Sequence, residues 1–394
     1  MTRIYGYYEY RGREWNLHGE DKDFNIDKVI RTGLELETEP SGNTYDQDAT
    51  ADFIYNTLDN KNVCATDGSL KRGGIEIITE PMTPTYLLNN YSDKFKTLLN
   101  GLSNTYNYQS HNGGHCGLHI HFTRPFNKGT EEDINFYNKL CFIFESFKEP
   151  IKQLSRRTNF EYCNYFSDAN RNADAREYKS IYGLSKKDLS GSHSYMLNNC
   201  NENTIEVRIL RGTLNYDTFI ASYKIIVNLF NLAFKDIKEL NGLSFKKAIN
   251  YYNDLDIKKY INDKQVNTDF KLYDYSKQLI KLEHVVNSIL LNSNKYLNKA
   301  ITELLKESKK IKMNNKSIED LKAYYNGLYS YIDKIDYINS TINNINKYID
   351  KTSDYYSYNE LLDQLRYITQ SYTTNNAKIE DLFNKIKKEL NKEF

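Results

Sequence analysis

The sequence predicts an α+β protein, with a mixed, strand-bearing domain over residues 1–242 followed by a helical domain over residues 243–394. All five prolines lie within the first 150 residues, and 17 of the 18 glycines lie at or before Gly242. Turn-forming residues therefore crowd the first part of the chain, where four short segments also alternate polar and apolar residues. After residue 242 the apolar residues instead recur at spacings of three and four, which is typical of helices.

Composition limits the classes of protein that this chain resembles. Its 394 residues hold 53 Lys and Arg against 52 Asp and Glu, so no global charge favours binding to nucleic acid or to an anionic membrane. The most apolar stretch, Ile225 to Phe234, is too short to span a bilayer, and the N-terminal segment lacks the apolar stretch of a signal peptide. Five cysteines without a C-x-x-C pair indicate reduced thiols. We expect a soluble, cytoplasmic protein that binds neither nucleic acid nor membrane.

The first two predicted strands carry carboxylates on one face. Thr32 to Thr38 (TGLELET) alternates leucine with Glu35 and Glu37, and residues two apart in a strand point to the same side. Gly74 to Thr79 (GIEIIT) sets Glu76 against two isoleucines in the same way. Each strand is therefore expected to have an aliphatic back and an acidic front.

Two later segments repeat this alternation with other polar residues. Gly117 to Phe122 (GLHIHF) and Thr204 to Leu210 (TIEVRIL) each place aliphatic or aromatic residues on one face. The polar face holds His119 and His121 in the third segment and Glu206 and Arg208 in the fourth.

The polar fronts of these four strands predict a site for metal ions and phosphate. Solvent-facing strands, which are the alternative explanation, usually carry Thr, Lys, Ser and Gln as well. Four carboxylates on one surface would repel one another unless a cation lay among them, and hard oxygen ligands with an imidazole suit Mg²⁺ or Mn²⁺. Arg208 beside them is suited to a phosphoryl oxygen.

In their order along the chain, these motifs resemble those of the amidoligase family. The family belongs to the carboxylate–amine ligase superfamily, together with glutamine synthetase and glutamate–cysteine ligase. The resemblance covers about residues 30–235, and the chain departs from the family pattern at Glu80, where Ser-Pro or a near equivalent is usual. The matching segments are GLELE (33–37), DGSLKRGGIEIITEP (67–81), CGLHIHF (116–122) and TIEVRILRGTLN (204–215).

The resemblance implies a curved antiparallel sheet of the glutamine synthetase-like type, backed by helices, whose concave face binds ATP and two or three Mg²⁺ ions. It implies that His119 reaches the metal or the nucleotide phosphates, with His121 as its neighbour, and that Arg208 contacts the transferring phosphate. The residues that match the family's metal-binding carboxylates are Glu35, Glu37, Glu76 and Glu206.

The resemblance also implies an activity, the ATP-dependent joining of a carboxylate and an amine through an acyl phosphate. The two substrates would be small molecules or groups on a peptide or protein. Asp67 and Ser69 lie where the family's second motif approaches the acceptor, and Asp67 is one candidate for the base that deprotonates the amine. Arg156, Arg157 and Tyr195 match positions between the third and fourth motifs and are candidates for substrate binding.

The C-terminal region is predicted to form an antiparallel helical bundle or coiled coil. Apolar residues follow a three–four spacing from Leu279 to Ala300, from Ile318 to Ile349 and from Ile379 to Leu390. Such apolar stripes usually pack against one another within the same chain. The alternative is that they bind a second copy of the chain or a protein partner. Near the other end of the chain, we expect Trp15 to pack in an N-terminal hairpin rather than to stack on a base.

Three other functions are compatible with these motifs. A Zn²⁺ hydrolase would use the H-x-H pair, His119 and His121, with the carboxylates and would not need ATP. A non-catalytic interaction protein would act through its helical tail. A kinase-like enzyme would release ADP without requiring an amine.

Overall fold

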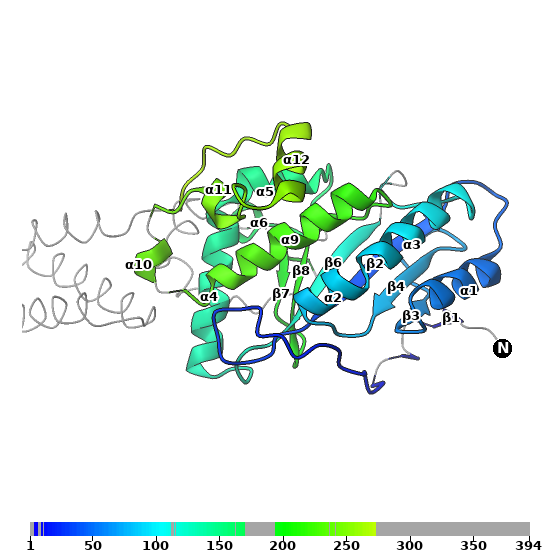
Figure 1. Ribbon diagram of the computed structural model, residues 1–394, viewed down its shortest axis with the longest axis horizontal. Coiled ribbons are helices and arrows are strands. Elements are labelled where there is room, and N and C mark those ends of the chain that lie inside the picture. The colour runs from blue at the N-terminus through cyan, green and yellow to red at the C-terminus, as the bar shows by residue number, and fades with distance from the viewer. Residues whose placement is uncertain are drawn as a thin grey trace, which may run out of the picture. The chain divides into compact units, whose positions relative to one another are not determined.

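The computed structural model describes residues 4–6, 9–10, 12–111, 114, 116–161, 163–169, 194–235, 237–240 and 242–272. In this part of the chain, eight strands form one curved, open sheet with the order β1-β3-β4-β2-β6-β8-β7, and β5 pairs with the end of β2 (Figure 1). β1 runs parallel to β3, and the other pairs are antiparallel. The strands are β1 (Ile4–Tyr5), β2 (Thr32–Pro40), β3 (Asn62–Ala65), β4 (Ile75–Thr79), β5 (Tyr108–Gln109), β6 (Gly117–Thr123), β7 (Leu197–Asn198) and β8 (Thr204–Arg211).

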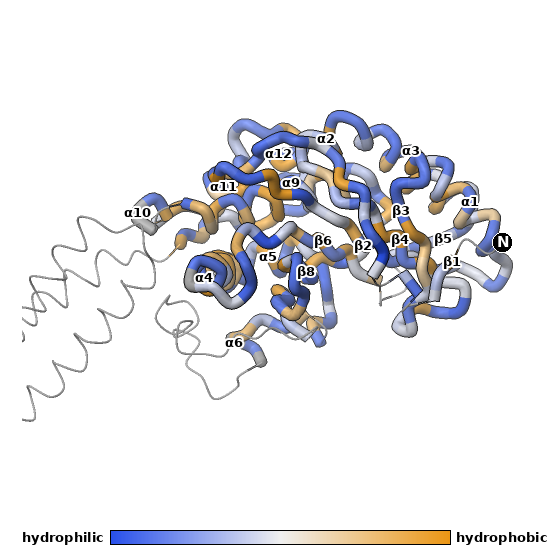
Figure 2. Tube along the Cα trace, turned by 90° about the horizontal axis from the view of Figure 1, so that it is seen from below, coloured by the Kyte–Doolittle hydropathy of each residue, from blue (hydrophilic) through white to orange (hydrophobic). Residues whose placement is uncertain are grey.

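Helices cover one face of this sheet and leave the other face accessible. Figure 2 shows α2, α3 and α9 on the same side of the strands. Several helices begin at a side-chain cap; Asp46, for example, accepts a hydrogen bond from the Ala49 amide at the start of α1. The helices are α1 (Gln47–Thr57), α2 (Pro84–Asn90), α3 (Ser92–Asn104), α4 (Glu131–Ser146), α5 (Lys148–Ser155), α6 (Phe166–Ala169), α9 (Tyr216–Leu232), α10 (Ile237–Leu240), α11 (Phe245–Ala248) and α12 (Leu255–Asp263).

The aliphatic backs of the strands form the core, as their alternation predicts. Leu36 pairs with Ile77 on β4 and with Leu118 on β6, and all three side chains are buried. The helices complete this core, since the Phe122 ring of β6 stacks on Phe230 of α9 at 3.9 Å between ring centres. Burial of this face fixes the strand register, because a slip of one residue would turn the apolar side chains to solvent.

A β-bulge interrupts the pairing of β6 with β8 beside the polar face. Leu118 pairs with Leu210 and Ile120 with Val207, so one residue of β6 faces two residues of β8. Strict alternation places Ile209 on the apolar face and Leu210 on the polar face, whereas the bulge brings Leu210 opposite Leu118, where it is buried.

The first compact unit continues beyond residue 242. It spans Met1–Tyr273, and the second spans Asp274–Phe394. The described residues after 242 belong to the first unit because α12 packs on α9, and the Tyr260 hydroxyl donates a 2.7 Å hydrogen bond to the Leu154 carbonyl. The helical patterns predicted from residue 279 onward lie outside the described residues.

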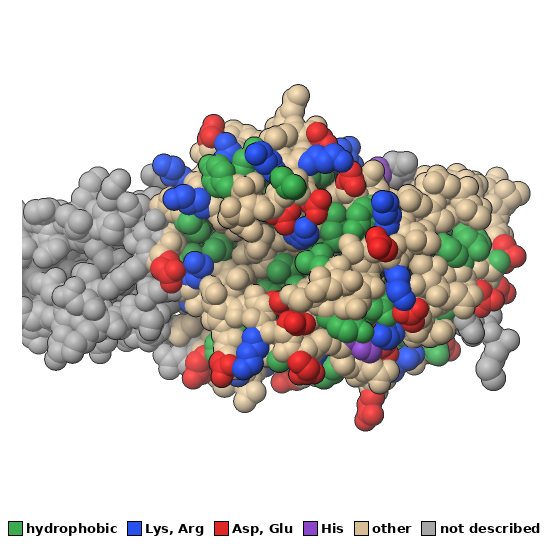
Figure 3. All heavy atoms as spheres, in the orientation of Figure 1, with side chains coloured by type: hydrophobic (Ala, Val, Ile, Leu, Met, Phe, Trp, Pro, Cys, Tyr) green, Lys and Arg blue, Asp and Glu red, His purple; other side chains and the backbone are tan. Residues whose placement is uncertain are grey.

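The described surface mixes charges of both signs. Figure 3 shows acidic and basic side chains interspersed over the face that carries the helices. Among the described residues, no helix combines the length and apolar character that a bilayer crossing requires.

Candidate functional site

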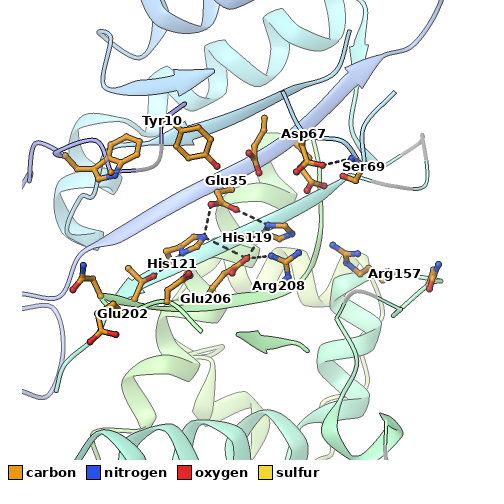
Figure 4. Close-up of a pocket in the computed structure, with 18 of the residues that line it drawn as sticks. Tyr10, Glu35, Asp67, Ser69, His119, His121, Arg157, Glu202, Glu206 and Arg208 are labelled. Atoms are coloured by element: carbon orange, nitrogen blue, oxygen red, sulfur yellow. Dashed lines mark hydrogen bonds and ion pairs between the residues drawn. The ribbon is translucent and has the colours of Figure 1, made fainter. Parts of the chain in front are cut away.

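The polar fronts of β2, β4, β6 and β8 meet in one cavity of about 850 Å³ (Figure 4). Strand pairing brings them together, because Glu37 lies opposite Glu76, Glu35 opposite His119, and His121 opposite Glu206. The sequence-predicted residues that line the cavity are Glu35, Glu37, Asp67, Ser69, Glu76, His119, His121, Arg157, Glu206 and Arg208.

A first group of possible metal ligands lies at the centre of the cavity. Glu35, His119 and Glu206 each offer one ligand atom, and these atoms lie within 4.8 Å of one another. The Nδ1 atom of His119 is 3.2 Å from Glu35 Oε2 and 3.5 Å from Glu206 Oε1. Asn198 orients Glu206 by donating a 2.7 Å hydrogen bond to its Oε2 atom.

A second group shares His119 with the first. Glu37, Glu76 and His119 meet the same 4.8 Å limit, and all three are buried. Glu37 accepts a hydrogen bond from the Gly117 amide, whereas the buried Oε2 atom of Glu76 has no hydrogen-bond partner within the described part of the chain. A buried carboxylate oxygen without a donor indicates a missing positive partner.

The charges of the site strongly perturb its acids. Burial and the negative charges of Glu35 and Glu37 raise the pKa of Glu76 to about 10. Burial also acts to raise the pKa of Glu35, but His121 and His119 outweigh it and hold that pKa well below its usual value. For His121 burial acts to lower the pKa, yet the carboxylates of Glu35 and Glu206 raise it to about 9. The carboxylates repel one another at short range, and a cation bound among them would favour their ionised forms.

These residues fit hard divalent cations. Carboxylate oxygens with one imidazole suit Mg²⁺ or Mn²⁺, and the oxygen of Glu76 that lacks a donor is the kind of atom that a cation would satisfy. Zn²⁺ also binds mixtures of histidine and carboxylate, so the side chains alone leave the hydrolase alternative open.

Two arginines lie on one side of the metal-ligand groups. Figure 4 shows Arg208 between Glu206 and Arg157. Arg208 forms an ion pair with Glu206, and Arg157 donates a 3.0 Å hydrogen bond to the Leu210 carbonyl. The buried Nε atoms of both arginines have no hydrogen-bond partner among the described residues, so both guanidinium groups retain capacity for an anion.

Gly117 provides the space in which His119 and Arg157 approach each other. A Cβ atom at this position would lie 2.6 Å from His119 Nε2 and 2.7 Å from Arg157 Nη2. Gly117→Ala is therefore expected to displace the shared imidazole and to weaken divalent-cation binding about tenfold or more, measured by calorimetric titration with Mg²⁺ or Mn²⁺.

Gly42→Ala is the matched control, because the nearest atom to a Cβ at Gly42 is at 3.6 Å, an ordinary contact. Equal cation affinity in the Gly117→Ala variant and this control would contradict the assigned role of Gly117.

Asp67 and Ser69 reach the cavity from the loop between β3 and β4. The Ser69 amide donates a 2.6 Å hydrogen bond to Asp67 Oδ1, which fixes the turn locally. Lys71 ties the same loop to the fully buried Glu39 at 3.0 Å, and the Tyr108 hydroxyl donates to the Gly73 carbonyl at 2.8 Å. The loop is thus held on the acidic side of the sheet.

The two other candidates from the sequence do not line this cavity. Arg156 ends α5 in a left-handed conformation with φ of 53°, and its carbonyl accepts a 3.1 Å hydrogen bond from Arg211. Arg156 is exposed, whereas Arg157, the residue that follows this left-handed position, lines the cavity. Tyr195 stacks on Phe166 with ring centres 4.5 Å apart. Their assignment to substrate binding stays a prediction.

Two segments outside the sequence-predicted site residues also line the cavity. Tyr10, Gly12 and Trp15 contribute from the N-terminal segment, and residues 201–204 contribute from the loop before β8. The sequence marked only the aromatic residues of the first segment as candidates for packing or stacking. The position of residues 201–204 depends on contacts with distant parts of the chain, which no local pattern reveals.

Arg124 holds the second of these segments. Its guanidinium donates to Asn199 Oδ1 at 2.7 Å and to the Asn201 carbonyl at 2.9 Å, while its Nε donates to the Glu202 carbonyl at 3.1 Å. Asp133 balances its charge at 2.7 Å, and both side chains of this pair are 3% exposed. The wall of the cavity near His121 therefore depends on one buried ion pair.

Removing this arginine should be costly, since it leaves Asp133 buried and unpaired. Arg124→Met is expected to lower the free energy of unfolding by about 3–5 kcal/mol, measured by urea denaturation. Lys259→Met, which breaks an exposed ion pair with Asp217 at 2.6 Å, is expected to leave the free energy of unfolding unchanged. Similar losses in the two variants would contradict this role of Arg124.

Known proteins offer little guide to the function of this chain, so the function is inferred from the geometry of the cavity. No protein-family model matches the sequence, and no curated protein matches it. A solved structure, the crystal structure of the complex between the prokaryotic ubiquitin-like protein Pup and its ligase PafA, is similar at 11% identity with a TM-score of 0.27. The match covers 52% of this chain and 46% of that chain, so it spans about half of each. We give this similarity no weight in assigning a function.

Proposed function

We propose that the protein is an ATP-dependent carboxylate–amine ligase that forms an amide through an acyl phosphate. The observation that carries this proposal is the convergence of four carboxylates, two imidazoles and Arg208 in one cavity. So many acids without enough fixed positive charge require cations, and an arginine beside the cations suits a transferring phosphoryl group.

The two ligand groups that share His119 would hold Mg²⁺ or Mn²⁺. When bound, these ions would screen the repulsion between an anionic carboxylate and the triphosphate and would stabilise charge on the transferring phosphoryl group.

The cavity side chains support a two-step reaction. Transfer of the γ-phosphoryl group of ATP to the carboxylate gives ADP and an acyl phosphate, and Arg208 would stabilise the negative charge on the equatorial oxygens. An amine then attacks the acyl carbon, phosphate leaves and an amide forms. Asp67, on the loop that reaches the cavity, is one candidate to accept the proton of the amine.

Arg157 and Ser69 are the proposed contacts of the carboxylate substrate. Arg157 retains a buried Nε donor, and a guanidinium is suited to a carboxylate. We extend the proposal to a peptide or protein as a carrier of one substrate, and to the helical patterns from residue 279 onward as the region that binds a partner or a second copy. The apolar stripes of the sequence support this extension.

Thermal unfolding with combinations of ligands tests the proposal before any substrate is known. Mg²⁺ together with a nonhydrolysable ATP analogue is expected to raise the midpoint more than either ligand alone, because ligands that bind the native state stabilise it by mass action. A screen of acid–amine pairs should then find ADP release that depends on both substrates.

Other outcomes would favour the alternatives. A rise with Zn²⁺ alone, and none with nucleotide, would overturn the ligase and favour the hydrolase. ADP release without any amine requirement would favour a kinase-like enzyme. No response to any of these ligands would favour a non-catalytic interaction protein that acts through its helical tail.

A further inference from the structure

One end of the cavity differs in chemistry from its acidic centre. Tyr10 and Trp15 line it from the N-terminal segment, and the polar side chains of residues 201–204 line it from the loop before β8. In Figure 4, Arg157 and Ser69 lie at one end of the metal-ligand groups, whereas Tyr10 and Glu202 lie toward the other end. One end of the cavity therefore bears Arg157 and Ser69, with Asp67 nearby, and the other end bears aromatic rings, amides and the carboxylate of Glu202.

The aromatic end is anchored to the sheet. Tyr10 and Trp15 pack against the buried cluster of Val63, Ala65 and Ile78, while both still line the cavity. The guanidinium of Arg13 lies 5.5 Å from the centre of the Trp15 ring. The indole is thus held by apolar contacts that leave part of it in the cavity.

The chain that follows Trp15 is fixed by polar contacts. Asn16 donates a 2.9 Å hydrogen bond to Glu80, and His18 Nε2 lies 2.6 Å from the other oxygen of the same carboxylate. The His18 amide also donates to the Pro81 carbonyl at 3.0 Å. These contacts fix the chain at residues 16–18, next to Trp15, before any ligand binds, which lowers the entropic cost of binding.

The charges of the cavity set the direction in which a nucleotide would lie. Phosphates would follow the metal-ligand groups, with the terminal phosphate near Arg208, because that guanidinium pairs with Glu206 of these groups and retains a buried donor. The base must then point away from Arg157, toward Tyr10. Trp15 packs on the same cluster as Tyr10 and also lines the cavity. A flat aromatic surface facing amide and hydroxyl groups suits a base, which stacks through its faces and forms hydrogen bonds through its edge.

We propose that Trp15, with Tyr10 and the side chains of residues 201–204, forms the binding subsite for the purine base of a nucleoside triphosphate. This inference rests on the proposed function, since it takes the triphosphate to lie on the metal-ligand groups. Trp15 provides the stacking surface, and the carboxamides of Asn201 and Asn203 face the edge of the base.

The chain offers a direct reporter, because Trp15 is its single tryptophan. The full-length protein is titrated with Mg²⁺ and either a nonhydrolysable ATP analogue or tripolyphosphate, which has the phosphates without the base. The analogue is expected to change the Trp15 fluorescence on saturation, whereas tripolyphosphate binds, by calorimetry, without that change. Stacking on an aromatic residue contributes roughly a ten- to hundred-fold gain in affinity, so the analogue should bind more tightly by that factor.

Variants separate stacking from support of the fold. Trp15→Ala is expected to reduce the affinity for the ATP analogue to the affinity for tripolyphosphate, and to leave tripolyphosphate binding unchanged. Trp15→Phe is expected to keep most of the difference in affinity between the analogue and tripolyphosphate. Asn203→Ala, at an exposed loop position, provides a second variant should Trp15→Ala fail to fold, and it should weaken binding of the analogue alone. Tyr252→Ala, at a residue that is 63% exposed and outside the cavity, is the control and should change neither affinity.

The outcomes distinguish the subsite from the proposed function. Equal affinities of the parent protein for the analogue and for tripolyphosphate would overturn the subsite and leave the triphosphate site intact. Equal weakening of both ligands by Trp15→Ala would show that Trp15 only supports the fold. Failure of both ligands to bind the parent protein would overturn the proposed function and, with it, this inference.

Discussion

Replacing Glu76 with glutamine is expected to abolish the thermal stabilisation by Mg²⁺ and nucleotide without destabilising the metal-free protein. Glu76 is buried among other carboxylates, which raise its pKa to about 10, and its Oε2 atom lacks a donor within the described residues. The side chain is therefore neutral in the metal-free protein and becomes a negatively charged ligand only when a cation binds. Glutamine keeps the size of the side chain and removes that charge. At a ligand concentration 100-fold above the dissociation constant, the stabilisation that disappears is about 2.7 kcal/mol, measured as a shift in the midpoint of thermal unfolding.

Glu80 provides a matched control for this variant. It is 2% exposed and lies just beyond the end of β4, yet its two oxygens contact Asn16 and His18 rather than the cavity. Glu80→Gln is therefore expected to lower the midpoint of the free protein and to keep the response to Mg²⁺ and tripolyphosphate, which does not use the proposed base subsite. An undiminished response in Glu76→Gln, or a lost response in Glu80→Gln, would show that the cations bind elsewhere.

The composition of the candidate site was accessible from the sequence because strand alternation is a local rule. Glu35 and Glu37, two residues apart, had to share a face, and the leucines that alternate with them determined which face joined the hydrophobic core. The resemblance to the amidoligase family implied that the strands would combine in one sheet, and pairing brings His119 opposite Glu35 and Glu76 opposite Glu37.

Contacts between distant parts of the chain were not accessible in this way. The bulge between β6 and β8 is a property of the pair, and neither sequence alone indicates that one residue of β6 faces two of β8. Arg124 acquires its role only where residues 199–204 fold back over β6, about 75 to 80 positions later in the sequence.

The positions of Trp15 and of the neighbouring pair Arg156 and Arg157 also depend on contacts that the sequence does not reveal. We expected Trp15 to pack in an N-terminal hairpin; it packs instead against residues of β3 and β4, and it also lines the cavity. Arg156 and Arg157 were equivalent candidates in the sequence, but a left-handed conformation at Arg156 directs only its neighbour into the cavity. Sequence patterns thus predicted the polar face of the sheet better than the segments that enclose it.

Replacing Arg208 with alanine is expected to slow ADP formation by roughly 10²–10³-fold, or about 2.7–4 kcal/mol of transition-state stabilisation, while the nucleotide still binds. The guanidinium contacts Glu206 through Nη1 and keeps a buried Nε without a hydrogen-bond partner among the described residues, so it is oriented with a donor to spare. Such a donor contributes most where negative charge develops during phosphoryl transfer. The rate is measured as ADP release with an acid–amine pair found in the screen, and binding as the thermal shift.

Two further variants separate this role from support of the fold. Arg208→Lys keeps the charge but loses the planar fork, so we expect a rate between those of the alanine variant and the parent. Arg211, three residues further along β8, bonds to the Arg156 carbonyl and does not line the cavity, so Arg211→Ala should leave the rate unchanged. Glu206 keeps its 2.7 Å hydrogen bond from Asn198 when Arg208 is removed, which limits the structural damage. A rate that survives in Arg208→Ala, or that falls equally in Arg211→Ala, would remove Arg208 from the chemical step and leave it as a counter-ion of Glu206.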